Sequence, residues 1–223
     1  MRCFVIGNGP SLNETPLDRL IGEVTFACNR IHLLYDKTKW RPTYYVQAET
    51  PQFDEQVWVE ATKIHLQLGC VMYLSGGHRG FYTNHHMRRY EVPKTRVEFM
   101  DFCQHLQESK VDPKNKPKSW HLPQICNYGS TVHVAMQAAV KEGFNPIYLV
   151  GCDLGYEEDK LNHFDERYTE GVPQLRDAKR LNTELLWAHK VAHKTAPVKI
   201  YNATIGGKLE VYPRVDFFKV VGE

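Results

Sequence analysis

The sequence has no long apolar run, no excess of charge of one sign and no closely spaced pair of cysteines. Its 223 residues include 28 lysines and arginines against 26 aspartates and glutamates, a formal net charge of +2. A balance this even does not predict nucleic-acid binding from composition. The apolar stretch before Gly7 is too short for a signal peptide or a membrane span, and no later stretch reaches spanning length. We therefore expect a cytoplasmic protein that binds no nucleic acid and has no transmembrane segment, with peripheral membrane contact and oligomeric state left open.

The six cysteines lie far apart, and no two of them form a C-x-x-C pair. Several stand inside apolar runs, such as Cys3 in RCFVI and Cys152 after YLVG. This pattern is typical of buried, reduced thiols in a cytosolic protein.

Short apolar runs alternate with helical patterns along most of the chain. Each run ends in glycine, proline or polar residues, as buried strands do. The predicted strands are Cys3–Ile6, Val24–Cys28, Thr43–Gln47, a strand within Lys63–Leu74, Pro146–Val150 and Val198–Tyr201. The longer predicted helices are Gln52–Thr62, Gly129–Glu142 and Gln174–Lys194. This alternation predicts an α/β fold of Rossmann-like, doubly wound type, with a mostly parallel sheet and helices on both faces.

The segment 75–123 interrupts this alternation with glycine, histidine, arginine and polar residues. We expect one domain over residues 1–223, in which this segment is an irregular, lid-like insertion with a helix near Val97–Gln107. Its basic cluster begins at His78 and Arg79 and continues to Arg89. The cluster is a solvated loop or an anion site for an acidic sugar or phosphate; no carboxylate or cysteine lies at metal-ligand spacing beside it.

The turn Gly7-Asn8-Gly9-Pro10-Ser11 follows the first predicted strand. A strand that stops at two glycines and leads into a helix presents free backbone N–H groups to an anion. The glycines allow close backbone approach, and Asn8 and Ser11 can hydrogen-bond a phosphate or ribose. The turn is not a G-x-G-x-x-G motif and lacks the lysine of a P-loop. A tight turn that binds nothing is the alternative.

Polar residues also follow other predicted strands, where ligands of open α/β sheets bind. Asn29 and Arg30 end the second strand, Gln47 ends the third, and Asp153 follows the strand Pro146–Val150. A helix start at Gly129, Ser130 and Thr131 is expected at the same edge. Each residue has a purely structural alternative as a turn former or a helix cap. Together they predict one shared nucleotide site, with Arg30 as a candidate contact for an anionic substrate.

Four stretches carry a resemblance to a known family: GNGPSL, ACNR, the YGST helix start and IYLVGCDLGY. They resemble bacterial sialyltransferases that build lipooligosaccharide sugars. The tail YNATIGG followed by PRV resembles the motility-accessory-factor glycosyltransferases and the MptE-like hydroxymethylpterin pyrophosphokinases. The similarities cover about two-thirds of the chain, at both ends, and leave the segment 75–123 unmatched.

The resemblance implies roles for individual residues. Asn8 and Asn29 contact the nucleotide of a CMP-sugar donor, and Ser130 or Thr131 binds its phosphate or ribose, although YGST departs from the family's T-S-G order. Tyr156 lies one position from the family's tyrosine on the leaving phosphate. His163 is the candidate general base, with different local spacing.

A histidine between acidic residues can also be argued as a general base from its chemistry alone. An ordinary surface histidine is the alternative for His163.

The preferred function is transfer of an acidic, sialic-acid-like sugar to a carbohydrate or glycoconjugate acceptor, with no obligatory cofactor or metal. Arg214 of the tail joins an anion site or pairs with an acidic neighbour.

Two rival functions stay open. A pyrophosphokinase would hold Mg²⁺ and ATP phosphates with Asp153, Asp165 and Glu166, although no D-x-D pair is present. A nucleotide-binding module without catalysis is the other rival, because a fold does not imply chemistry.

Overall fold

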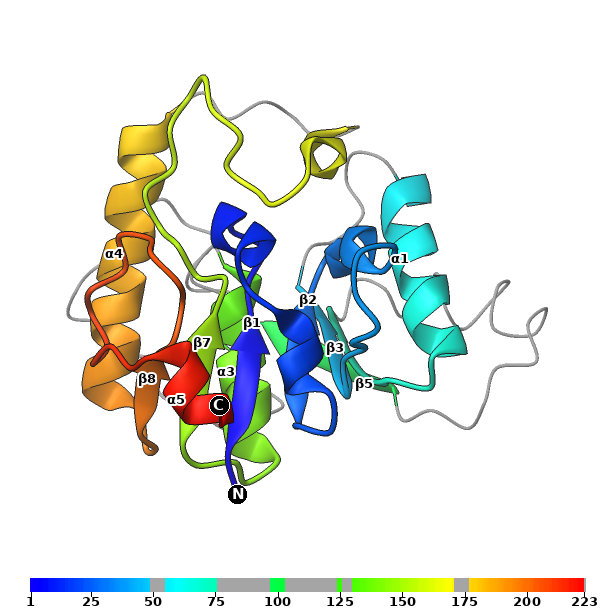
Figure 1. Cartoon of the computed structure of the whole chain (residues 1–223), viewed down its shortest axis with the longest axis horizontal. Helices are drawn as coiled ribbons and strands as arrows, with labels where there is room; N and C mark the ends of the chain where they lie inside the picture. Colours follow the sequence, from blue (N-terminus) through cyan, green and yellow to red (C-terminus); the bar gives the residue numbers. More distant parts are fainter. Residues whose placement is uncertain (49–54, 76–96, 103–123, 126–129, 171–176, 223) are drawn as a thin grey trace.

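The computed structural model describes residues 1–48, 55–75, 97–102, 124–125, 130–170 and 177–222 (Figure 1). Its eight strands form one sheet in the order β6-β5-β4-β3-β2-β1-β7-β8, and every pairing is parallel. The strands are β1 Cys3–Ile6, β2 Thr25–Cys28, β3 Tyr44–Gln47, β4 Val71–Ser75, β5 Val97–Phe102, β6 Gln124–Ile125, β7 Ile147–Val150 and β8 Ile200–Asn202.

The α-helices are α1 Glu55–Gln67, α3 Thr131–Lys141, α4 Ala178–Thr195 and α5 Phe217–Val221. Short 3-10 helices stand at η1 Pro10–Asn13, η2 Leu17–Leu20, η3 Ile31–Leu34 and η7 Glu166–Thr169. None of the helices in the described part of the chain is both long and apolar enough to cross a bilayer.

The two faces of the sheet are covered by different elements, because successive strand side chains point to opposite faces. Cys3 and Val5 of β1 pack in a core with α3 and with Ala192 of α4. Phe4 and Ile6 pack on the other face in a core with η1, η2, η3 and α5. On that second face α1 covers Met72 and Leu74 of β4. The predicted doubly wound α/β fold, with helices on both faces, is confirmed.

One predicted element is wrong. The helix expected near Val97–Gln107 is strand β5, which pairs with β4 in the register Met72↔Val97. The stretch VEFMDF alternates side-chain character in a way that suits a strand, and the edge of β4 offers it a ladder of backbone partners. The predicted insertion 75–123 therefore contains part of the sheet, while its segments 76–96 and 103–123 lie outside the described residues.

Candidate functional site

The order in which the chain adds strands to the sheet reverses between β1 and β7. From β1 the chain builds the sheet outward through β2 to β6, and then returns to add β7 and β8 on the other side of β1. In open α/β sheets, ligands bind outside the carboxyl ends of the strands at such a switch point. The turn after β1 and the residues Gly151-Cys152-Asp153 after β7 meet at this edge, which we call the carboxyl edge.

The glycines of the first turn accommodate groups of the protein itself. A Cβ atom on Gly7 would lie 2.4 Å from the carbonyl oxygen of Gly151, and one on Gly9 would lie 1.8 Å from Oδ2 of Asp153. Only a residue without a side chain fits either position. The two glycines therefore allow the loop after β7 to pack directly against the turn after β1.

Ser11 and Asp153, both predicted nucleotide contacts, bind each other. The Ser11 hydroxyl donates to Oδ2 of Asp153 at 2.7 Å, and its backbone N–H lies 3.3 Å from Oδ1. Burial raises the pKa of the Asp153 carboxyl, and the hydrogen bonds from Ser11 oppose that shift. The turn thus holds an anion, but that anion is a side chain of the protein.

Asn8 and Asn29 lie together beside this turn. The Asn8 Nδ2 donates to the carbonyl of Cys28 at 3.2 Å, which joins the first turn to the end of β2. Asn29 has a left-handed backbone, with φ of +51°. The Oδ1 atoms of both asparagines are buried and have no hydrogen-bond partner among the described residues. Because buried polar atoms are almost always paired, these two acceptors are suited to a ligand.

The start of α3 adds a hydroxyl at the same edge, since α3 packs on β1, β2 and β3 and leads into the amino end of β7. Ser130 caps the helix by accepting a hydrogen bond from the backbone N–H of Val132 at 3.3 Å. Thr131 is only 6% exposed, and its Oγ1 has no partner within the described part of the chain. Gly129 lies outside the described residues.

Gln47 is buried in a polar network below the carboxyl edge. Its Oε1 accepts hydrogen bonds from the Tyr45 hydroxyl at 3.1 Å and from the Thr62 hydroxyl at 2.9 Å. The Tyr45 hydroxyl also lies 2.9 Å from the carbonyl oxygen of Asn29, so its single proton is shared between these two acceptors. Gln47 therefore supports the turn that carries Asn29.

His163 lies against the first turn. Its Nδ1 is 3.3 Å from the carbonyl oxygen of Asn8, and its ring stacks on Tyr168 with 3.9 Å between centroids. The Tyr156 ring approaches edge-on at 6.1 Å. Burial lowers the pKa of His163 to about 4, while the hydrogen bond to Asn8 opposes the shift. The imidazole is therefore neutral at physiological pH, with Nδ1–H donating to the Asn8 carbonyl and Nε2 carrying the lone pair.

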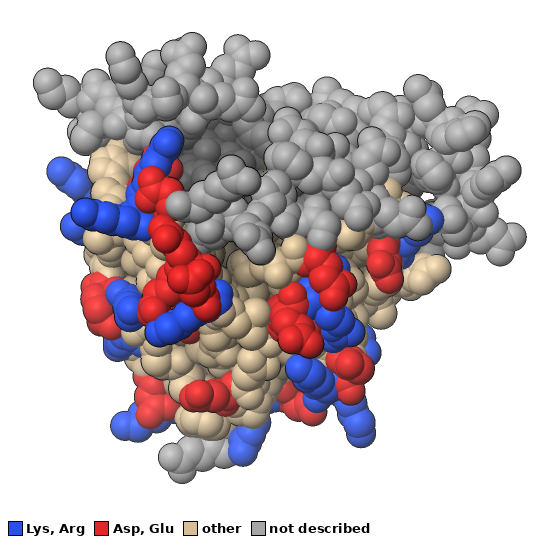
Figure 2. All heavy atoms as spheres, turned by 90° about the horizontal axis from the view of Figure 1, so that it is seen from above, with Lys and Arg blue, Asp and Glu red and all other residues tan. Residues whose placement is uncertain are grey.

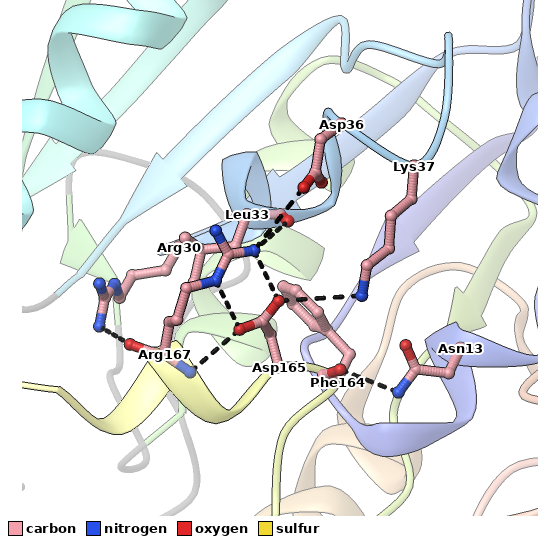
Figure 3. Close-up of polar contacts among 8 residues, drawn as sticks. All are labelled: Asn13, Arg30, Leu33, Asp36, Lys37, Phe164, Asp165 and Arg167. Carbon is pink, nitrogen blue, oxygen red and sulfur yellow. Dashed lines mark hydrogen bonds and ion pairs between the residues drawn. The ribbon is translucent and has the colours of Figure 1, made fainter.

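Residues 163–170, which we call the strap, cross the carboxyl edge above η1 (Figure 1). The backbone N–H of Phe164 donates to the Asn8 carbonyl at 3.2 Å, and Asn13 Nδ2 donates to the Phe164 carbonyl at 2.8 Å. Asp165 caps η7 and forms an ion pair with Arg167 at 2.7 Å (Figure 3). The Arg167 guanidinium holds the pKa of Asp165 at about 2.

Two predicted anion-binding arginines bind backbone carbonyls. Arg30 Nη1 donates to the carbonyls of Arg167, Tyr168 and Glu170 in the strap. Arg214 donates to the carbonyls of the tail residues Thr204, Gly206 and Gly207, and its Nε pairs with Glu210 at 2.7 Å. His78 and Arg79 lie outside the described residues.

The carboxylates proposed for Mg²⁺ do not converge. Asp153 binds Ser11, whereas Asp165 binds Arg167 and lies 3.8 Å from Lys37. Within the described residues, no three histidine, cysteine or acidic side chains form a group that could hold a metal ion. Seen from above the carboxyl edge, acidic and basic side chains are interspersed over the described surface (Figure 2).

The sequence reasoning missed two residues that shape the site. Tyr168 stacks on His163, and Asn182 of α4 bonds the backbone of Tyr156 in both directions, at 2.8 Å each way. Asn182 lies 26 residues beyond Tyr156, so no local spacing signals this contact. For Tyr168 the sequence offers only a weak signal, its position five residues after the candidate base.

Comparison with known proteins gives one informative result. No protein-family model matches the sequence, and no curated protein matches it. Among solved structures the fold is similar to the MAf glycosyltransferase from Magnetospirillum magneticum AMB-1, with a TM-score of 0.58 and 14% sequence identity. The alignment covers 96% of this chain but 33% of that protein. The similarity shows a shared fold over almost the whole of this chain, which spans about a third of its structural neighbour.

Proposed function

We propose that this chain is a glycosyltransferase that transfers an acidic, sialic-acid-like sugar from a CMP-type donor to a carbohydrate hydroxyl. One observation carries the proposal: a neutral histidine is hydrogen-bonded to Asn8, in the same turn whose asparagine side chain presents an unpaired buried acceptor. Asn8 therefore contacts the proposed proton acceptor, His163, through its backbone and presents a ligand-binding atom through its side chain. The fold shared with a named glycosyltransferase supports the reaction class.

In this proposal, the unpaired oxygens of Asn8, Asn29 and Thr131 bind the nucleotide. Amide and hydroxyl groups of this kind recognise a nucleoside without a metal, and the start of α3 favours the donor phosphate. The Tyr156 hydroxyl assists departure of the phosphate. The bond from the anomeric carbon to the phosphate oxygen breaks, and a bond from that carbon to the acceptor oxygen forms.

His163 takes the proton of the acceptor hydroxyl on Nε2. Its Nδ1–H stays on the Asn8 carbonyl, which sets the tautomer and the direction of the ring. With a pKa of about 4 the free side chain is available in its basic form but is only weakly basic. An anionic donor bound beside it favours the imidazolium and raises its pKa toward the operating pH.

The first experiment is a thermal-shift panel of CMP, CDP, UDP, GDP and ATP, each with Mg²⁺ and with EDTA. A nucleotide at a hundred times its dissociation constant stabilises the fold by about 2.7 kcal/mol, which shifts Tm by a few degrees. Stabilisation by CMP or CDP that survives EDTA supports the transferase. Stabilisation by ATP with Mg²⁺ alone supports the pyrophosphokinase, and no shift with any nucleotide contradicts nucleotide binding altogether.

The second experiment measures sugar transfer from CMP-sialic acid to acceptor glycans. His163→Ala should lower kcat by about 10²- to 10⁴-fold, the usual contribution of a general base, and retain CMP binding. His193→Ala is the matched control, because His193 is exposed on α4 and contacts the ring of Tyr212 rather than the carboxyl edge. CMP binding without transfer to any acceptor would favour the non-catalytic binding module.

A further inference from the structure

The strap that carries His163 is attached to the body of the protein at both of its ends. At its start, Phe164 and Asn13 fix the backbone beside the first turn. At its end, η7 makes no backbone pairing to the sheet within the described residues, and side chains supply the attachment instead. Arg167 Nη2 donates to the carbonyl of Leu33 at 3.2 Å, and a buried side chain from the end of β2 binds carbonyls of the strap. That side chain is Arg30.

Arg30 reaches the strap from the turn after β2 (Figure 3). Its Nη1 lies 2.5 Å from the carbonyl of Arg167, 2.8 Å from that of Tyr168 and 3.2 Å from that of Glu170. The side chain is only 5% exposed. A guanidinium so buried needs acceptors, and the last carbonyls of a helix supply them for Nη1, whereas Nε has no partner among the described residues. Nη1 carries two N–H groups, so one of them is shared between two of the three carbonyls, and the guanidinium holds the strap at residues 167, 168 and 170.

Tyr168 connects this attachment to the histidine. Its carbonyl accepts from Arg30, and its ring stacks on His163 at 3.9 Å with an interplanar angle of 22°. Tyr168 is 8% exposed, so its ring also shields one face of the imidazole from water. A shift of the Tyr168 backbone would therefore change both the direction of His163 and its solvation.

We propose that Arg30 is the positioning residue for His163, acting through Tyr168. This role rests on the proposed function of His163 as the base. The sequence predicted Arg30 as an anion contact, whereas the structure has all three bonds of its Nη1 on the strap. Its use is to keep a neutral, oriented imidazole against the first turn before substrate arrives.

The groups around His163 allow a clean test. The Asn8 carbonyl and the rings of Tyr156 and Tyr168 face it. In the strap, Asp165 and Arg167 pair with each other, and Lys37 lies 3.8 Å from Asp165 and Asp36 4.0 Å from Arg167. Burial is the main cause of the low pKa of His163, so loss of the Tyr168 packing should raise it.

The test is NMR titration of ¹³C-labelled histidines, with His163 assigned from a His163→Gln spectrum, and it requires no turnover. In the wild-type protein His163 should stay unprotonated down to about pH 4, and in Arg30→Met its midpoint should move toward the ordinary 6.5. Arg30→Lys should restore part of the shift. Arg41→Met is the control, since Arg41 also donates to three carbonyls but lies on the η3–β3 connection.

Tyr168→Leu and Tyr168→Phe separate packing from charge, because both variants keep the Arg30 cation. The leucine variant should raise the His163 midpoint as Arg30→Met does, and the phenylalanine variant should keep it low. These variants also decide the matter if Arg30→Met does not fold. An unchanged midpoint in Arg30→Met and Tyr168→Leu, with a lower Tm alone, would make Arg30 merely structural and overturn the proposal.

Two further readouts separate this proposal from the proposed function. The acid limb of the kcat/KM profile for sugar transfer should move with the NMR midpoint, while the Kd for CMP stays unchanged. A weaker Kd for CMP in Arg30→Lys would make Arg30 a ligand contact and contradict the positioning role. Absence of transfer in every variant, with the NMR shift as expected, would contradict the transferase and leave the strap geometry intact.

Discussion

The two halves of the carboxyl edge contain similar small polar residues, but in one half these residues bind other groups of the protein and in the other their oxygens have no partner among the described residues. On the β7 side, Gly7, Gly9 and Ser11 are fully engaged with Gly151 and Asp153, so the turn is completed from within. On the β2 and α3 side, the side-chain oxygens of Asn8, Asn29 and Thr131 are buried without partners among the described residues. Unpaired buried oxygens cost stability, and a site that retains them is prepared for a ligand. We call these the closed half and the open half.

The largest expected effect is on the closed half. In Gly9→Ala the new methyl group would meet the Asp153 carboxylate at 1.8 Å and push it away from Ser11. Overpacking together with a stranded carboxylate should lower the free energy of unfolding by about 3 kcal/mol or more, measured by urea denaturation.

A double-mutant cycle shows whether that loss comes from Asp153. In an Asp153→Gly background the clash with the carboxylate is absent and the remaining close contact is the Gly151 carbonyl oxygen at 2.9 Å, so Gly9→Ala should then cost far less. Gly22→Ala is the control for backbone strain, since Gly22 has φ of +89° and open space around it. It should cost about 1 kcal/mol. Equal costs in both backgrounds would show that Asp153 is not the reason for the glycine.

Ser11→Ala should cause the next largest loss of stability. It removes the hydroxyl that donates to Asp153, a bond to a charged group worth about 2 kcal/mol. The pKa of Asp153 is already raised by burial and should rise further. A raised carboxyl pKa gives stability that is present at low pH and lost as pH rises through the folded value. The difference from wild type should therefore be largest at neutral pH and should narrow as the pH is lowered.

The pH dependence that the strap gives to stability should be smaller for each pH unit. The pKa of His163 is about 4 in the folded protein and 6.5 in the ordinary case, so between these values only the unfolded chain takes up the proton. Stability should fall as the pH drops through this window, by about 1.4 kcal/mol per pH unit for this one histidine. In His163→Asn that part of the slope should vanish. Parallel slopes for the two proteins would contradict a buried neutral imidazole.

The smallest effects come from two threonines that compare the halves directly. Thr204 is buried on the closed side, where its Oγ1 accepts from the N–H of Cys152 at 3.1 Å, whereas Thr131 Oγ1 has no partner among the described residues. Thr204→Val should destabilise the fold by about 1 kcal/mol and leave the Kd for CMP unchanged. Thr131→Val should leave the fold as stable or slightly more stable.

Affinity for CMP is the second measurement that distinguishes the two threonine variants. Loss of one hydrogen bond should weaken CMP binding to Thr131→Val by about tenfold, measured by calorimetry. The reverse pattern, with a destabilised Thr131→Val that binds CMP normally, would show that the open half is not a ligand surface.

Local patterns were enough to predict most of the fold. The run at Cys3–Ile6 is fully buried, and Pro146–Val150 contains the largely buried strand Ile147–Val150. The sequence alone predicts both as strands. Strand β5 was missed because its place depends on pairing with β4, a tertiary contact that short apolar patterns do not report.

For the site, the sequence predicted which residues meet but not what they do there. Parallel strands bring Asn8 and Asn29 to one edge, as expected. That Asp153 would bind Ser11, or Arg30 the strap, could not be foreseen, because each contact joins residues more than a hundred positions apart. Whether the predicted residues bind a nucleotide remains a prediction.

The central position of β1 has a consequence for folding kinetics. Cys3 begins a strand whose partner on one side, β7, starts at Ile147, so that side cannot pair until most of the chain has been synthesised. Such distant pairing is slow to form and leaves an apolar strand edge open to other chains in the meantime. We expect contacts such as Gly7 with Gly151 to form late, so that substitutions there speed unfolding more than they slow folding. The edge that would bind the ligand is then the last part of the molecule to be assembled.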